Sequence, residues 1–223
     1  MKEILQRNHE LLAQVDDWFA RCTAAYPEHI ACQSGCSGCC RSTFDITLVD
    51  AYYLKQGFDL LPTAVRAAVL SKCRERLAMM QQEWPEFDHP FVLNYRPEED
   101  WELLMPDEDE TPCVLLGDDG RCLVYDHRPM TCRLHGIPLV DTEGEVMHDE
   151  WCTMNFTEVD PLQLPALTAP FDAILRAEVA LFRDFTQKLL GQRVSELDTL
   201  IPLALMIDFE GFNWNAWAGT AGE

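Results

Sequence analysis

Ten cysteines in a chain of 223 residues limit what this protein can fold into more than any other feature of its sequence. Eight of them form two sets. The first set brings four thiols into nine residues: Cys32, Cys36, Cys39 and Cys40. The second set is spread along the chain: Cys113, Cys122, Cys132 and Cys152. Clustered thiols are typical of disulfides, catalytic cysteines or metal sites, and each of these predicts a different setting.

The rest of the composition narrows that choice. The opening residues, MKEILQRNHELLAQVDDWF, carry charges throughout and no apolar run, so we expect no signal peptide and a cytoplasmic protein. No segment reaches the roughly 18 apolar residues that span a bilayer, so we expect no membrane association. Because cytosolic thiols stay reduced, metal or redox chemistry is favoured over disulfides. The formal net charge of -21 repels phosphate backbones, so nucleic acid is not an expected partner.

The hydrophobic pattern predicts helices at both ends of the chain. Apolar residues recur at helical spacing over 2–24, over 47–56 with an end at Gly57, from Pro62 to about 84, and over 171–189. Two apolar runs flank Gly-Asp-Asp-Gly at 117–120, and residues 137–148 repeat that arrangement, which predicts two β-hairpins. Residues 195–198 resemble a capping box and predict a last helix.

We therefore expect an α-rich α+β fold, with helices at both ends around a metal-stapled core of cysteine loops and two small hairpins. The length fits a single domain over 1–223. Within it we expect a cysteine-cluster metal-binding region over about 30–155 and a C-terminal helical extension over about 165–223.

The number and spacing of the cysteines indicate metal ligation. Eight thiols are twice the complement of a four-cysteine zinc site or cubane cluster. The neighbours Cys39 and Cys40 should diverge, so they serve two sites, or one of them is a spare or redox thiol. The sequence does not assign which cysteines share a site. Cys22 and Cys73 lie on apolar helix stripes and are interpreted as core residues.

Four arginines fall within these motifs: Arg41, Arg121, Arg128 and Arg133. Eight thiolates with two divalent ions would leave a charge of about −4, which guanidinium groups can screen through hydrogen bonds to sulfur. We expect the arginines to support the bound metal or cluster. His127, His135 and His148 are interpreted as surface or supporting residues, because eight thiols already suffice as ligands.

A family resemblance agrees with this reading. Cys32, Cys36 and Cys39-Cys40-Arg41 are followed by Pro112-Cys113, by Cys122 with Tyr125, and by Arg128-Pro129 with Cys132-Arg133. This order resembles the CxxCxxCC family, the YkgJ-type cysteine-cluster proteins described as zinc- or iron-chelating, over roughly 30–155. The first gap holds three residues where the family name has two. The resemblance implies metal binding through these cysteines and no particular reaction.

Other functions of clustered cysteines predict sequence features that this chain lacks. Some related family members are lysine N-methylases thought to carry an iron–sulfur cluster, but no Gly-rich turn for a methyl donor is present here. A radical S-adenosylmethionine enzyme would usually carry an aromatic residue where Gly38 precedes Cys39, and its barrel needs repeated strand-helix units. A thiol enzyme would not need eight clustered cysteines. An iron–sulfur methylase or oxidoreductase is the alternative, and cysteine spacing does not separate zinc from iron.

Overall fold

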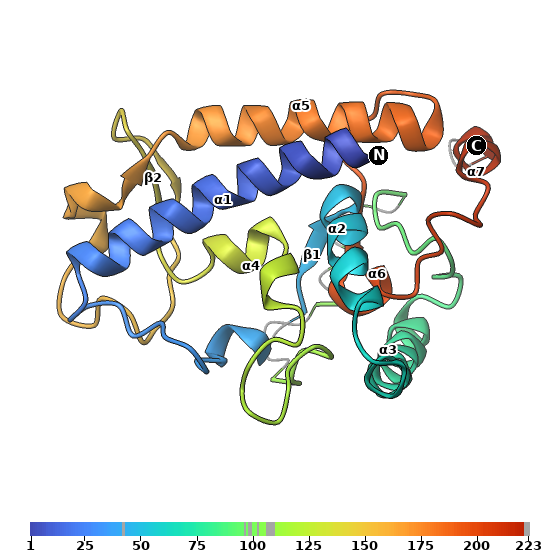
Figure 1. Ribbon diagram of the computed structural model, residues 1–223, viewed down its shortest axis with the longest axis horizontal. Coiled ribbons are helices and arrows are strands. Elements are labelled where there is room, and N and C mark those ends of the chain that lie inside the picture. The colour runs from blue at the N-terminus through green and yellow to red at the C-terminus, as the bar shows by residue number, and fades with distance from the viewer. Residues whose placement is uncertain (42, 96, 98–99, 102, 106–109, 221–223) are drawn as a thin grey trace.

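The computed structural model describes residues 1–41, 43–95, 97, 100–101, 103–105 and 110–220. Its fold is α+β, as the sequence predicts, with about half of the residues in helices and two small sheets. Helices lie at both ends of the chain (Figure 1). Within the described residues, no helix has the length and apolar character needed to cross a membrane.

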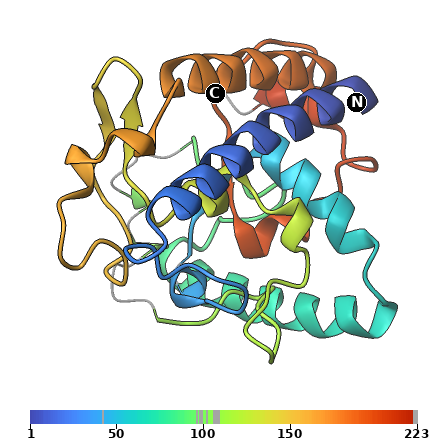
Figure 2. The same ribbon diagram turned by 60° about the vertical axis from the view of Figure 1, so that its left-hand side comes forward.

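Two long helices, α1 (Lys2–Ala25) and α5 (Phe171–Leu190), lie side by side and antiparallel (Figures 1 and 2). Both bury one apolar face, as their 3.6-residue periodicity predicts. The Trp18 ring packs edge-on against Phe171, with 4.9 Å between ring centroids. Near the other end of the pair, Arg7 forms a 2.8 Å ion pair with Asp184. Helix α5 ends at Gly191, whose φ of 75° is the left-handed conformation that glycine adopts most readily.

Helices α2 (Leu48–Asp59) and α3 (Thr63–Glu83) confirm two further predictions, with one change at a boundary. The Thr47 side chain caps α2 by accepting a hydrogen bond from the Asp50 amide. The predicted end at Gly57 is wrong, because α2 continues to Asp59. Gly57 lies where α2 packs on His127, and a Cβ at this position would come within 2.6 Å of His127 Cβ. Close packing, and not helix termination, explains this glycine.

The strands are short and join distant parts of the chain. Strand β1 (Asp45–Thr47) pairs antiparallel with β5 (Asp198–Leu200), and Ile46 faces Thr199. In the second sheet, β2 (Leu139–Asp141) lies between antiparallel β3 (Val146–His148) and parallel β4 (Thr168–Ala169). The C-terminal part of the chain therefore contributes a strand to each sheet.

The hairpin predictions have different outcomes. The hairpin over 137–148 is confirmed as β2 and β3. The one around 117–120 is a tight turn with a single bridge between Leu116 and Cys122. The capping box at 195–198 is wrong, because Asp198 begins β5. The other elements of the described residues are α4 (Met130–Leu134), α6 (Ile201–Ala204), α7 (Trp214–Thr220) and the 3-10 helices Gly38–Arg41, Tyr125–His127, Pro161–Gln163 and Pro165–Leu167.

The buried side chains form two clusters, and α2 contributes to both. The larger joins α2, α3, α6 and the second half of α5. The smaller lies between α1 and the start of α5, around Trp18 and Phe171. Cys113, Cys122 and Cys132 pack against the larger cluster, and Cys32 packs against the smaller. The cysteine loops thus rest on both clusters.

Candidate metal centre

The fold brings the two cysteine sets together, although more than 70 residues separate Cys40 from Cys113 in the sequence. The Cys113 amide donates a 2.7 Å hydrogen bond to the Cys40 carbonyl. The turn at 117–120 packs on the first cysteine loop, because a Cβ at Gly120 would lie 3.0 Å from the Gly35 carbonyl oxygen. All ten cysteines are free thiols.

One group of thiols contains Cys32, Cys36 and Cys152. A Cβ at Gly136 would lie 3.5 Å from Cys32 Sγ and 3.7 Å from Cys152 Cβ, so both cysteines border this glycine. Burial raises the pKa of Cys32, the Asn155 hydrogen bond opposes that rise, and the nearby thiols of Cys36, Cys152 and Cys39 add to it. The Cys32 sulfur therefore has Asn155 and these three thiols as neighbours.

A second group contains Cys40, Cys113, Cys122 and Cys132. Burial raises the pKa of Cys113 to about 11, and the Cys122 thiol contributes to the rise. Burial likewise raises the pKa of Cys132, with added effects from Cys113 and Cys122. Thiols that influence one another in this way repel as thiolates unless a cation lies among them.

Backbone amides point at two sulfurs of the second group. The Leu115 amide hydrogen-bonds to Cys113 Sγ, and the Val124 amide hydrogen-bonds to Cys122 Sγ. In both cases the donor lies two residues after the cysteine. Amides in this position favour the thiolate, which is the form that binds metal.

Cys39 and Cys40 lie at the junction of the two groups. Their thiols are hydrogen-bonded to each other, and this bond raises the pKa of Cys39 and lowers that of Cys40. The thiols of Cys113, Cys132 and Cys122 in the second group act in the opposite direction and raise the pKa of Cys40. The Cys39 thiol raises the pKa of Cys32 in the first group. It also raises the pKa of Cys113 and Cys132 in the second group.

The cysteine side chains, all of which the structure describes, do not converge on a common point that would hold an ion. Among the described residues, no three His, Cys, Asp or Glu side chains are placed as a ready metal site. The donors themselves fit a soft metal, because they are thiols in two groups with amide hydrogen bonds to sulfur. Loading with metal would therefore require the sulfurs to move closer together.

Comparison with known proteins supports this chemistry. Residues 31–153, more than half of the chain, match the CxxCxxCC family model, whose description reads "putative zinc- or iron-chelating domain". The chain belongs to the CxxCxxCC family. No curated protein and no solved structure gave a significant match. The matched CxxCxxCC segment contains all eight clustered cysteines and excludes α1 and α5.

The four arginines of this CxxCxxCC protein occupy different positions. Arg128 favours the thiolates of Cys39, Cys122 and Cys132, since it lowers the pKa of each. Its guanidinium lies over the Tyr125 ring, 3.7 Å from the centroid. Arg133 is buried and hydrogen-bonded to backbone carbonyls. Arg41 and Arg121 are exposed.

The histidines near the second set pack against other groups. His127 stacks on Tyr53, with 4.9 Å between ring centroids, and His135 lies 5.7 Å from the Phe44 ring. His148 is exposed on β3. Cys22 and Cys73 are fully buried, as their apolar stripes predict. Cys73 nevertheless lies near Cys113. Burial is the main cause of the raised pKa of Cys73, and the Cys113 thiol adds to it.

Two residues at the centre carry no sequence signal for it. Asn155 is 1% exposed, and its Nδ2 donates to Cys32 Sγ at 3.5 Å and to the Gly136 carbonyl at 2.6 Å. Its Oδ1 accepts a hydrogen bond from the Ala31 amide at 2.9 Å. Arg76 on α3 lowers the pKa of Cys113. Neither residue belongs to a cysteine motif, so only the fold shows these roles.

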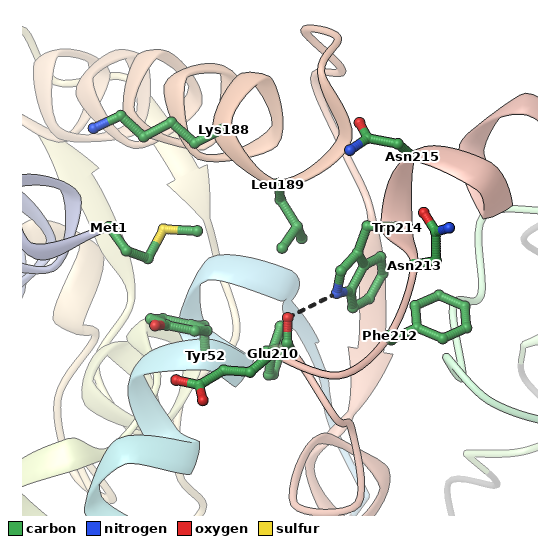
Figure 3. A pocket seen from close by; sticks show the side chains of 10 residues that line it. Met1, Tyr52, Lys188, Leu189, Glu210, Phe212, Asn213, Trp214 and Asn215 are labelled. Atoms are coloured by element: carbon green, nitrogen blue, oxygen red, sulfur yellow. Dashed lines mark hydrogen bonds between the residues drawn. The ribbon is translucent and has the colours of Figure 1, made fainter.

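A cavity of about 340 Å³ opens elsewhere on the molecule, between the end of α5 and the segment leading into α7 (Figure 3). Tyr52, Phe209 and Trp214 line it, together with Lys188 and Glu210. The Trp214 indole already donates to the Phe209 carbonyl at 3.2 Å. No cysteine lines this cavity, so it is separate from the candidate metal centre.

Proposed function

We propose that this protein binds zinc or iron through its eight clustered cysteines, in two four-cysteine groups. The first group is Cys32, Cys36, Cys39 and Cys152. The second is Cys40, Cys113, Cys122 and Cys132. The main support is the contact between the two cysteine sets at Cys40. The Cys40 carbonyl accepts a hydrogen bond from the Cys113 amide, and three thiols of the second set raise the pKa of Cys40.

The assignment of Cys39 to the first group follows from the others. Cys40 already completes four sulfurs in the second group, and Cys32, Cys36 and Cys152 need a fourth. The Cys39 thiol raises the pKa of Cys32, and Cys39 is the neighbour of Cys40 in the sequence. Two neighbouring residues that serve two adjacent sites would place the bound metals close together.

The protein's part in this function is to hold thiolates and to offset their charge. The amides of Leu115 and Val124 and the guanidinium of Arg128 favour the ionised sulfurs. Zinc would cross-link the loops without redox chemistry, whereas an iron–sulfur cluster would supply electron transfer. In either case the metal staples segments that lie far apart in the chain and so contributes to folding.

Anaerobic purification followed by absorption spectroscopy and metal analysis tests the proposal. A brown protein with a broad band near ~400 nm and acid-labile sulfide would establish a cluster, and a colourless protein with about two zinc ions per chain would establish zinc. Cys36→Ser and Cys132→Ser should each lower the metal content. Cys22→Ala, which removes a buried thiol on α1, should leave it unchanged. A wild-type protein that takes up neither metal would refute the function.

A further inference from the structure

The short helix that carries Cys132 is held from the side of α2. Helix α4 has five residues, too few to be stable without contacts from the rest of the chain. Its first amide, that of Met130, donates to Asp50 Oδ2 at 2.7 Å, across 80 residues of sequence. Because a buried carboxylate is costly without hydrogen-bond donors, this contact fixes α4 and α2 against each other.

Asp50 also receives a donor from α1. It is 3% exposed, and Asn8 Nδ2 donates to Asp50 Oδ1 at 3.5 Å. Burial raises the pKa of Asp50 to about 6, while the Met130 amide, the Asn8 amide and the charge of Arg133 oppose that rise. Asp50 thus lies between α1 and the beginning of α4, with donors on both sides.

Arg133, the residue after Cys132, closes the same segment from its other end. It is 7% exposed, and it donates to the carbonyls of Arg128 and Asp126 at 2.9 Å each. Its Nη1 also pairs with the carboxylate of Asp16 on α1. Tyr53 on α2 donates its hydroxyl to the same Asp126 carbonyl at 3.1 Å. The chain on both sides of Cys132 is therefore bound to α1 and α2.

We propose that Asp50 and Arg133 are positioning residues for Cys132: they hold its turn so that the thiolate faces the other sulfurs of the second group. The inference rests on the proposed metal-binding function. It extends that function to α1, which lies outside the matched segment 31–153 and supplies Asn8 and Asp16. Loss of such supporting contacts typically weakens metal affinity by about 10- to 100-fold.

Metal-free, reduced protein titrated with Co²⁺ tests this role. Thiolate-to-cobalt charge-transfer absorption reports the number of sulfur ligands, and competition with a chromophoric chelator gives the affinity. We expect Asp50→Ala to weaken one of the two cobalt equivalents by about 10- to 100-fold and to reduce the absorption. Asp50→Asn keeps an oxygen that can accept from the Met130 amide, so it should restore most of the affinity.

Two further comparisons separate positioning from general stability. Asp141 is another buried aspartate, and it accepts the Asp172 amide at the start of α5, so Asp141→Ala should destabilise the fold but keep both cobalt equivalents. Asp16 and Asp17 are exposed neighbours on α1, and the structure pairs Asp16 with Arg133. Asp16→Ala should weaken the same equivalent as Asp50→Ala, and Asp17→Ala should not.

The outcomes are distinguishable from a failure of the proposed function. If wild type binds two cobalt ions and both Asp50→Ala and Asp16→Ala match it, the positioning role is wrong and metal binding stands. An equal loss in Asp141→Ala, or no rescue by Asp50→Asn, would also overturn the positioning role. If wild type takes up no cobalt and also holds neither zinc nor iron, both proposals fail together. If it holds iron but takes up no cobalt, the iron content of the same variants replaces the cobalt readout.

Discussion

Gly57 shows how a single residue couples a helix to the cysteine-bearing part of the chain. It lies inside α2, where alanine would ordinarily be about 1 kcal/mol more favourable. Here a Cβ would come within 2.6 Å of His127 Cβ and 2.7 Å of His127 Nδ1. His127 belongs to the segment that leads from Cys122 to Cys132, so the close contact sets the distance between that segment and α2.

We expect Gly57→Ala to destabilise the protein by about 1–3 kcal/mol, because the added methyl group overpacks a contact that has no free space. Urea unfolding of the variant and wild type, followed by circular dichroism, gives the difference. Gly219→Ala is the control, since a Cβ at this α7 position meets no atom within 4 Å. Equal or greater stability of Gly57→Ala would show that His127 moves aside without cost.

Among the residues of the candidate centre, those with a motif could be predicted and those without one could not. The number and spacing of the cysteines identify them as candidate ligands, and Arg128 is a candidate because it lies between Cys122 and Cys132 in the sequence. Asn155 reaches Cys32 across more than 120 residues of sequence, and Asp50 reaches α4 across 80. Such contacts depend on how the helices pack, so a local sequence pattern does not predict them.

At the scale of elements, length decides what the sequence reveals. Helices α1 and α5 span 20 residues or more and bury one continuous apolar face each, so their periodicity is clear. Helix α3 is as long, but it buries only Val69, Cys73 and Met80. Strand β5 has three residues, and its partner β1 lies about 150 residues earlier. Residues 195–198 carry a local helix signal there, but pairing with β1 and burial of Thr199 and Leu200 prevail.

The two cysteine groups should lose metal independently, because they rest on different elements. We expect Cys152→Ser to remove about one of two metals and Cys122→Ser to remove the other, since a tetrahedral site rarely survives the loss of a thiolate. The double variant should hold none. Metal analysis of each purified variant measures this.

Cys73→Ala is the matched control for that experiment. Cys73 is a buried thiol near Cys113, but it lies on the apolar face of α3. It should keep both metals. If Cys73→Ala loses metal, or if Cys122→Ser and Cys152→Ser lose the same one, the division into two groups is incorrect.

At the scale of the whole molecule, the net charge of -21 coexists with acidic groups inside the fold. Burial raises the pKa of Asp50 and of Asp198 to about 6, and that of Glu178 to about 7. Ionising these groups in the folded state is costly. The metal-free protein should therefore lose stability as the pH rises toward neutrality, and bound metal would offset that loss by cross-linking the loops.

Asp198 isolates this effect, because it is 5% exposed on β5 and no cysteine is among the groups that shift its pKa. Below about pH 4 the carboxyl is protonated in both states and has no effect on stability. As the pH rises toward 6, the unfolded chain releases the proton and the folded one keeps it, so stability falls. Asp198→Asn cannot ionise and still offers an oxygen to Asn94. Its stability relative to wild type should rise by about 1–3 kcal/mol between pH 4 and pH 7.

Urea unfolding of metal-free, reduced protein across that range measures the difference, and Asp184→Asn supplies the opposite case. Arg7 lowers the pKa of Asp184 through a hydrogen bond, so Asp184 stabilises the fold when ionised and loses that contribution as the pH falls. Asp184→Asn should therefore be less stable than wild type near neutral pH and approach it in acid. A constant gap between Asp198→Asn and wild type from pH 4 to pH 7 would mean that Asp198 ionises as readily inside the fold as in the unfolded chain.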